Sequence, residues 1–495
     1  MSGASTRVSV VRVLVLLLAL VMVGLGIRWF ATRGLERPPA PELPAFAGYV
    51  DVTATPPYAF ESPSDAPQSN VILSFIVAGT DAPCTPTWGT YYTLETANSD
   101  LDLNRKIAQL RSVGGTVAVS FGGQINSELA VACIDPAALE AAYQAVVDQY
   151  ELSRIDLDIE GPALTDVPSQ QRRATAIAAV QKTVADAGGD LQVWVTLPVD
   201  PNGLTRDGVA VVRTLTERGV TLAGVNGMAM NFGGSKETNE SMSTAVLRAT
   251  DSLQAQVSGL LPGSTWDQVG TTVMIGQNDI PGEVFTLEDA KVVNEYALRK
   301  GVGLLSMWSL NRDQTCQPPL PKTVEVVQTN CSGINQDGYA FADVLASGAT
   351  TPDRSPASSP VAPTPAQQIT DDPKTSPYPI WDPQGTYPTG TRTVWKRKVY
   401  KSRYWTSGVE PGSVPAGQEN PWILIGPVMP GDTPAPLPTL PAGTYPKWKA
   451  DKVYNAGDRV QHDKVGYEAK WWTKDQEPGK PVAGGSPWTL ITPSG

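Results

Sequence analysis

The stretch that organises this chain is RIDLDIEG, at residues 154–161. Its alternation of apolar and acidic residues has a period of two and predicts a β-strand over residues 154–159. The acids Asp156, Asp158 and Glu160 then share one face, and the aliphatic residues between them point the other way. Carboxylates on an otherwise apolar, buried strand are costly unless they are used. The stretch therefore predicts a buried strand with a candidate site at its end.

Strand-like and helix-like segments alternate on both sides of this stretch. Apolar runs of strand length lie at 46–51, 71–77, 116–120, 191–197, 224–230, 271–275 and 303–308. Helical patterns lie between them, such as 103–111, 136–150, 169–187 and 287–300. Eight β/α units in about 300 residues predict an α/β fold, a (β/α)8 TIM barrel. A doubly wound open sheet fits fewer strands and usually shows a phosphate-binding glycine loop, which we do not find.

The net charge and the histidine content limit which partners and which kinds of catalysis are possible. The formal net charge of −11 argues against a nucleic-acid partner. The single histidine, His462, lies near the end of the chain. A Ser-His-Asp triad or a Cys-His catalytic pair in the first 461 residues is therefore excluded. Any reaction there must then use carboxylates, hydroxyls, amides or a borrowed group. Because the carboxyl ends of barrel strands open onto the active face, Glu160 is the acid placed to meet substrate.

The N-terminal segment 1–36 predicts export. Its apolar run at 13–27 lies between Arg12 and Arg28, and counted from Val8 it reaches about 20 residues, enough to span a bilayer if the Arg12 side chain extends to the surface. An uncleaved signal anchor and a cleaved signal peptide both remain open. In either case we expect an extracytoplasmic chain, secreted or anchored to the membrane by this helix.

The chain has four cysteines, which is consistent with an oxidising, extracytoplasmic compartment. None forms a CxxC pair, so a metal site is weakly indicated, and an exported chain favours two disulfides. The favoured disulfides are Cys84–Cys133 and Cys316–Cys331, because the members of each pair lie on loops that the barrel brings together. Free buried thiols are the alternative.

The C-terminal part has a different composition. A Pro/Ser/Thr-rich linker spans 348–378, and a second Pro-rich linker spans 427–444. The modules 379–426 and 445–495 are repeats of each other, because rare aromatic residues and glycines recur at a constant offset of 67. Each is predicted to be a small all-β domain of short strands and turns.

The acid row resembles the Asp-x-x-Asp-x-Asp-x-Glu signature of the glycoside hydrolase family 18 chitinases, with Ser153 departing from it at the first position. The stretch SFGG at 120–123 and Trp308 match further landmarks of that family. The resemblance covers about residues 37–347 and implies a retaining, substrate-assisted mechanism that needs no metal or cofactor. It implies Glu160 as general acid, Asp158 as the group that orients the substrate's acetamido group, and Asp156 as its support.

The same resemblance suggests residues that bind substrate. Trp308 would lie under the sugar, Tyr49 matches an aromatic residue found near that site, and Asn231 keeps a polar group after the sixth strand. Met230 departs from the family's tyrosine and lacks its hydroxyl, which Gln277 is a candidate to replace.

The second C-terminal module resembles the chitin-binding modules of carbohydrate-binding families 5 and 12. Trp471 and Trp472 are expected on adjacent strand positions, which face opposite sides, so at least one should be an exposed platform for a sugar ring while the other packs. Tyr404 and Trp405 take these places in the more divergent first module, for which a different ligand or little binding at all stays open.

These features together predict an extracytoplasmic chitinase, held on chitin by its C-terminal modules. Two alternatives stay open at this point. One is an endo-β-N-acetylglucosaminidase that acts on peptidoglycan or N-glycans, and the other is a non-hydrolytic chitin-binding lectin.

Overall fold

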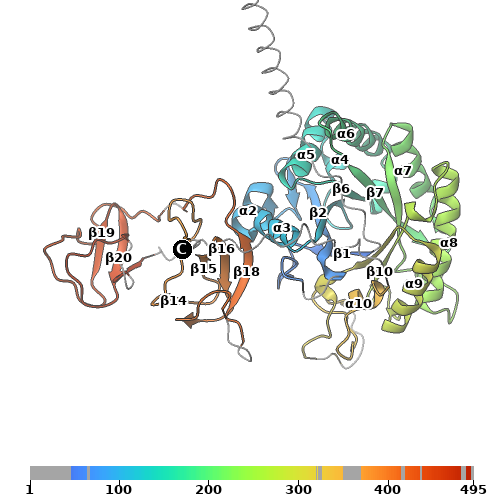
Figure 1. Cartoon of the computed structure of the whole chain (residues 1–495). Coiled ribbons are helices and arrows are strands. Elements are labelled where there is room, and N and C mark those ends of the chain that lie inside the picture. The colour runs from blue at the N-terminus through green and yellow to red at the C-terminus, as the bar shows by residue number, and fades with distance from the viewer. Residues whose placement is uncertain are drawn as a thin grey trace, which may run out of the picture. The chain divides into compact units, whose positions relative to one another are not determined.

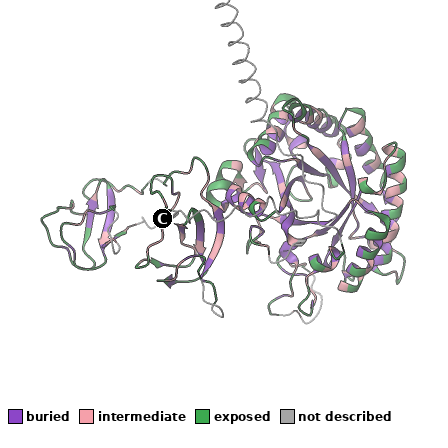
Figure 2. Ribbon diagram, viewed as in Figure 1, coloured by how far each residue is buried: buried purple, intermediate pink, exposed green. Residues whose placement is uncertain are grey.

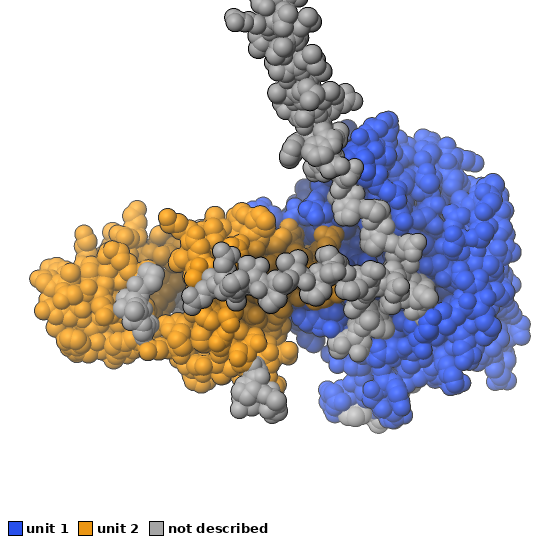
Figure 3. All heavy atoms as spheres, viewed as in Figure 1, with its two compact units in different colours: residues 1–101, 114–354 blue, residues 102–113, 355–495 orange. Residues whose placement is uncertain are grey.

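The computed structural model describes residues 46–63, 67–318, 320, 326–348, 370–413, 419–434, 437–480 and 486–491. The expected membrane segment within 1–36, and most of the linker predicted at 348–378, lie outside these residues. Among the residues described, no helix combines the length and apolar character needed to cross a bilayer. The chain divides into two compact units, residues 1–101 with 114–354, and residues 102–113 with 355–495 (Figure 3).

Eight parallel strands of the first unit close into a barrel (Figure 1). Each strand pairs with its neighbours in register, and the pairing of the first strand with both the second and the last closes the ring. The TIM-barrel prediction is confirmed, with each strand within a few residues of its expected place. The strands, in their order around the ring, are β1 (Phe46–Asp51), β13 (Leu304–Trp308), β10 (Val269–Met274), β9 (Leu222–Met228), β7 (Gln192–Asp200), β6 (Arg154–Asp158), β5 (Thr116–Gly122) and β2 (Asn70–Ala78).

The helices begin and end where local sequence signals place them. In α9, Thr286 and Asp289 form a reciprocal capping box, and Gly301 ends the helix in the left-handed conformation. Asp135 caps α5, with Pro136 at the first helical position. The helices are α2 (Leu94–Leu101), α3 (Leu103–Ser112), α4 (Leu129–Ala132), α5 (Pro136–Gln149), α6 (Val167–Asp186), α7 (Arg206–Glu217), α8 (Met242–Leu260), α9 (Leu287–Lys300) and α10 (Phe341–Leu345).

The barrel strands are buried on both faces, as their apolar sequences predicted (Figure 2). One cluster of buried residues fills part of the barrel interior, and Phe75 and Trp308 pack against it; it contains Ala47, Tyr49, Ile72, Ala118, Trp194 and Leu304. The interior is therefore a packed core that can hold the acid row rigidly.

Two disulfides close loops of the first unit, and both predicted pairs are confirmed. Cys84 is bonded to Cys133 across 49 residues, and Cys316 is bonded to Cys331 across 15 residues.

Each C-terminal module contains a three-stranded antiparallel sheet. In the first module the strands are β15 (Arg392–Trp395), β16 (Lys398–Ser402) and β18 (Trp422–Pro427). In the second they are β19 (Arg459–His462), β20 (Val465–Ala469) and β21 (Trp488–Leu490). The prediction of small all-β modules is confirmed.

Candidate active site

Strand β6 delivers the acid row to the carboxyl end of the barrel. Its neighbours β5 and β7 place Ser120 and Trp194 beside Asp156, and Gly122 and Thr196 beside Asp158. Gly122 has a φ of 109°, and a Cβ added there would meet the carbonyl oxygen of Asp158. Only glycine fits this close approach.

Asp156 lies deepest and is held by hydroxyl groups from three other strands. Its Oδ2 accepts hydrogen bonds from Tyr49 at 2.9 Å and from Ser120 at 2.7 Å. Its Oδ1 accepts one from Thr196 at 2.6 Å. Burial raises the pKa of this carboxyl, and the three hydroxyl donors act in the opposite direction. Because its acceptors are occupied and it does not line the cavity described below, Asp156 is a positioning residue.

Asp158, two residues further along the strand, has no such support. It is buried, and its Oδ1 makes no hydrogen bond to any described residue. Burial raises the pKa of Asp158 well above its ordinary value, and the charges of Glu160 and Asp156 raise it further. An unpartnered, buried acceptor on the cavity wall is suited to receive a donor from a bound molecule.

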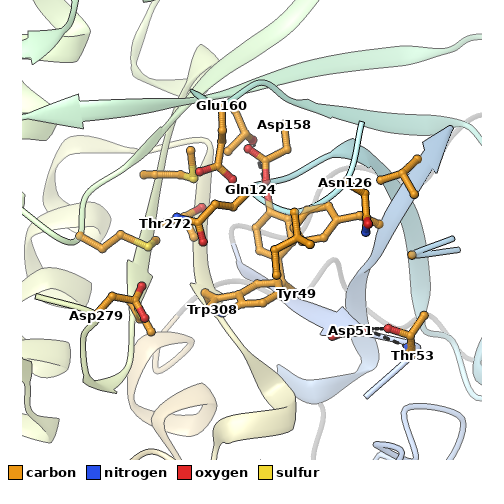
Figure 4. Close-up of a pocket in the computed structure, with 18 of the residues that line it drawn as sticks. Tyr49, Asp51, Thr53, Gln124, Asn126, Asp158, Glu160, Thr272, Asp279 and Trp308 are labelled. Carbon is orange, nitrogen blue, oxygen red and sulfur yellow. Dashed lines mark hydrogen bonds between the residues drawn. The ribbon is translucent and has the colours of Figure 1, made fainter. Parts of the chain in front are cut away.

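Glu160 follows the end of β6 and extends into the cavity with Asp158 (Figure 4). Burial raises its pKa to about 7, and the charge of Asp279 contributes. A carboxyl group that titrates near neutral pH can donate a proton as a general acid.

The cavity has a volume of about 330 Å³. Trp308 forms part of its wall, with its ring stacked on Phe75 at 5.5 Å between centroids and 6.1 Å from the ring of Tyr49. An aromatic wall beside two carboxyls suits a ligand with an apolar face and polar edges. The lining of the cavity includes Tyr49, Phe75, Gln124, Asn126, Asp158, Glu160, Met230, Asn231, Asp279 and Trp308.

Met230 and Asn231 both line the cavity as predicted, but the side chain of Asn231 is already engaged. Its Nδ2 donates to Asp279 Oδ2 at 2.8 Å, and its Oδ1 accepts from the backbone N–H of Asp279 at 2.8 Å. The loop between β11 (Gly276–Gln277) and β12 (Val284–Phe285) thus places a carboxyl group beside Asn231.

Gln277, the predicted replacement for the missing hydroxyl, is placed outside the cavity lining. It is buried in β11, which pairs with β12. Its backbone N–H donates to Ser332 and its carbonyl accepts from Arg312. Its position gives no support to the predicted contact with substrate.

Several polar or aromatic groups of the cavity were not predicted from the sequence, among them Phe75, Gln124, Asn126 and Asp279. Gln124 and Asn126 directly follow β5, and Asp279 follows the β10–β11 segment. A search for polar residues just beyond each strand end would have found these three.

We expected one ring of the Trp471–Trp472 pair to be exposed and the other to pack, but both follow the end of β20, where the alternation of a strand no longer applies. Trp471 and Trp472 are both exposed, as are Tyr404 and Trp405. Trp488 and Tyr467 form the buried core of the second module instead.

Comparison with known proteins supports both parts of this description. The chain is 34% identical over 298 residues to a probable bifunctional chitinase/lysozyme of Escherichia coli, and 33% identical over 298 residues to endochitinase 11 of Metarhizium anisopliae. These alignments cover 58% of this chain, and 33% and 56% of the two relatives, so the chain spans a third to about half of their lengths. The catalytic domain of a chitinase from Pyrococcus furiosus superposes with a TM-score of 0.54 at 26% identity, covering 64% of this chain and all of that one.

The barrel is homologous to chitinases. Residues 447–489 match carbohydrate-binding module family 5/12. The match lies inside the second C-terminal module and includes Trp471 and Trp472. The resemblances found in the sequence are thus confirmed for the chitinase-like barrel and for the second module.

Proposed function

We propose that this chain is a chitinase, which hydrolyses β-1,4-linked N-acetylglucosamine polymers with retention of configuration and binds insoluble chitin through its second C-terminal module. The observation that supports the proposal most strongly is that Glu160 and Asp158 both line the same cavity. Glu160 has a pKa raised to about 7, and Asp158 is buried with an unpartnered oxygen.

In this mechanism Glu160 donates its proton to the glycosidic oxygen as the bond breaks. The substrate's own 2-acetamido oxygen attacks the anomeric carbon and forms an oxazolinium ion. The acetamido N–H donates to Asp158, whose negative charge stabilises the positive ion. Water then attacks the anomeric carbon from the face left by the leaving group, and Glu160 takes up its proton.

Asp156 and Trp308 assist without taking part in proton transfer. The hydroxyls of Tyr49, Ser120 and Thr196 hold Asp156 beneath Asp158. Trp308 supplies a flat apolar surface for the sugar ring at the cleavage point.

The two other readings of the sequence are less well supported. A non-hydrolytic lectin has no need of a carboxyl with a pKa near 7 in its binding cavity. Both relatives of the barrel are named as chitinases, although one is also named a lysozyme, and this shared activity favours chitin over peptidoglycan or N-glycans.

We also propose an extracytoplasmic location. Two disulfides suit an oxidising compartment, and the apolar run at 13–27 suits export, followed by anchoring or release. Cell fractionation with thiol labelling tests this: the protein should be found outside the cytoplasm with all four cysteines protected.

The activity test is hydrolysis of soluble chitooligosaccharides by the chain and by its Glu160→Gln variant, with the anomers of the products resolved. We expect β-anomeric N-acetylated fragments from the parent and none from the variant. Binding to chitin without any product would support the lectin instead.

A further inference from the structure

The first C-terminal module, which the family 5/12 match does not include, keeps the strand layout of the second module. At the offset of 67, β15 and β16 coincide with β19 and β20 at both ends. The hairpin turns agree as well: Lys396 and Arg397 have positive φ angles, as do Asp463 and Lys464.

The cores of the two modules are built from the same contacts. The Nε1 of Trp422 donates to the carbonyl of Val409 at 2.9 Å, and the Nε1 of Trp488 donates to the carbonyl of Gln476 at 2.7 Å. The ring of Tyr387 packs against Trp422 at 5.1 Å, as that of Tyr454 packs against Trp488 at 5.2 Å. The divergence of the first sequence has therefore left its scaffold intact.

One further position shows how a substitution preserves that scaffold. Trp395 stands where the second module has His462. Trp395 donates through Nε1 to Glu410 at 2.9 Å, while His462 Nε2 lies 3.1 Å from Glu477, which is Glu410 shifted by 67. Each ring also makes an edge contact with a tryptophan, Trp381 or Trp448.

The exposed aromatic pairs of the two modules also have nearly the same exposed fractions. Tyr404 and Trp405 are 39% and 61% exposed, and Trp471 and Trp472 are 41% and 62% exposed. The strand leading into each pair is held alike, because the N–H of Arg403 donates to the carbonyl of Pro421 and that of Lys470 to Pro487. The hydroxyl of Tyr404 donates to the carbonyl of Glu419 at 3.1 Å, which restrains that ring.

Packing does not account for a tryptophan that stays more than half exposed. Flat aromatic faces open to solvent suit the apolar faces of β-linked pyranose rings, and the second module carries the same pair within a carbohydrate-binding family match. We propose that Tyr404 and Trp405 form a second binding site for β-1,4-linked N-acetylglucosamine chains, so that the protein binds insoluble chitin at two module sites. This rests on the proposed function for the choice of polymer.

Two sites on one chain make the second binding event intramolecular, which raises apparent affinity for a polymer without any new contact. The consequence is specific: removing one aromatic pair should weaken binding to chitin, and removing both should weaken it far more.

The test uses the full-length chain carrying Glu160→Gln, so that chitin is not consumed. Partition onto crystalline β-chitin is measured for this parent, for Tyr404→Ala/Trp405→Ala, for Trp471→Ala/Trp472→Ala, and for all four substitutions together. Val453→Ala, another exposed apolar position of the second module, is the matched control. Near-UV circular dichroism checks that the buried Trp422 and Trp488 keep their environments.

We expect Trp471→Ala/Trp472→Ala to retain binding at least about tenfold tighter than the fourfold variant, with Tyr404→Phe/Trp405→Phe close to the parent. Equal binding by Trp471→Ala/Trp472→Ala and the fourfold variant would overturn the proposal, as would a first-module site that binds cellulose and not chitin. Hydrolysis of soluble oligosaccharides by the unsubstituted chain is scored separately, so failure of this site is distinct from failure of the proposed chitinase activity.

Discussion

Asn231 and Asp279 hold each other through two hydrogen bonds of 2.8 Å, one from the amide Nδ2 to the carboxylate and one from the backbone N–H of Asp279 to the amide oxygen. Asn231 follows β9 and has a φ of 52°, while Asp279 lies on the loop after β11. The contact holds a carboxylate on the cavity wall, where its charge helps to raise the pKa of Glu160.

The first prediction concerns this charge. In Asp279→Asn the negative charge is lost, so the pKa of Glu160 should fall and Glu160 should lose its proton at a lower pH. The alkaline limb of kcat/KM, expected near pH 7 in the parent, should move to lower pH, with a severalfold loss of activity at pH 7. A pH profile on a soluble substrate measures this. An unmoved limb would show that Asp279 does not tune Glu160.

The second prediction concerns Glu160 as the proton donor. Glu160→Gln keeps the shape of the side chain and cannot donate a proton, so kcat should fall by about 10²- to 10⁴-fold. Binding of chitooligosaccharides, measured by calorimetry, should remain within severalfold of the parent. Residual activity above a tenth of the parent would assign the proton donor to another group.

The third prediction separates activity from stability at Asp158. Because burial and two neighbouring carboxyls raise its pKa in the folded protein, its contribution to stability is fullest in acid and is lost as the pH rises towards that raised pKa. Asp158→Asn is neutral at every pH. It should therefore stabilise the barrel more at pH 8 than at pH 4, while lowering kcat by about 10²- to 10³-fold.

Thermal unfolding midpoints at the two pH values measure the effect on stability. Asp148→Asn, on the exposed side of α5, is the matched control and should follow the parent at both pH values. A gain of equal size at pH 4 and pH 8 would show that the charge of Asp158 is not the cause.

The fourth prediction concerns the disulfides. Cys84–Cys133 closes a loop of 49 residues, and its replacement by two serines should cost about 4 kcal/mol of unfolding free energy. Cys316–Cys331 closes 15 residues and should cost about 3 kcal/mol. Denaturant titration of the two double variants tests both values, and a larger loss for the shorter loop would contradict the chain-entropy reasoning.

Much of the architecture could be predicted from local patterns. A strand buried on both faces is mostly apolar, so seven of the eight barrel strands were visible as short apolar runs, and β6 was visible by its alternation of apolar and acidic residues. The row Asp156, Asp158 and Glu160 was visible because side chains two positions apart share a face of a strand. The two modules were visible because rare aromatic residues held one offset across both copies.

The composition of the cavity could not be predicted, because it depends on which loops meet when the ring of strands closes. Phe75 and Trp308 lie far apart in sequence, and no local pattern indicates that their rings stack. Asp279 reaches the cavity while Gln277, two residues earlier, is held in the β11–β12 pair. Side-chain direction in a loop is set by its hydrogen-bond partners, and here these come from other loops, such as those of Asn231 and Ser332. Strand periodicity thus revealed the acids themselves, whereas the environment that sets their proton affinity arises from residues that only the closed barrel brings together.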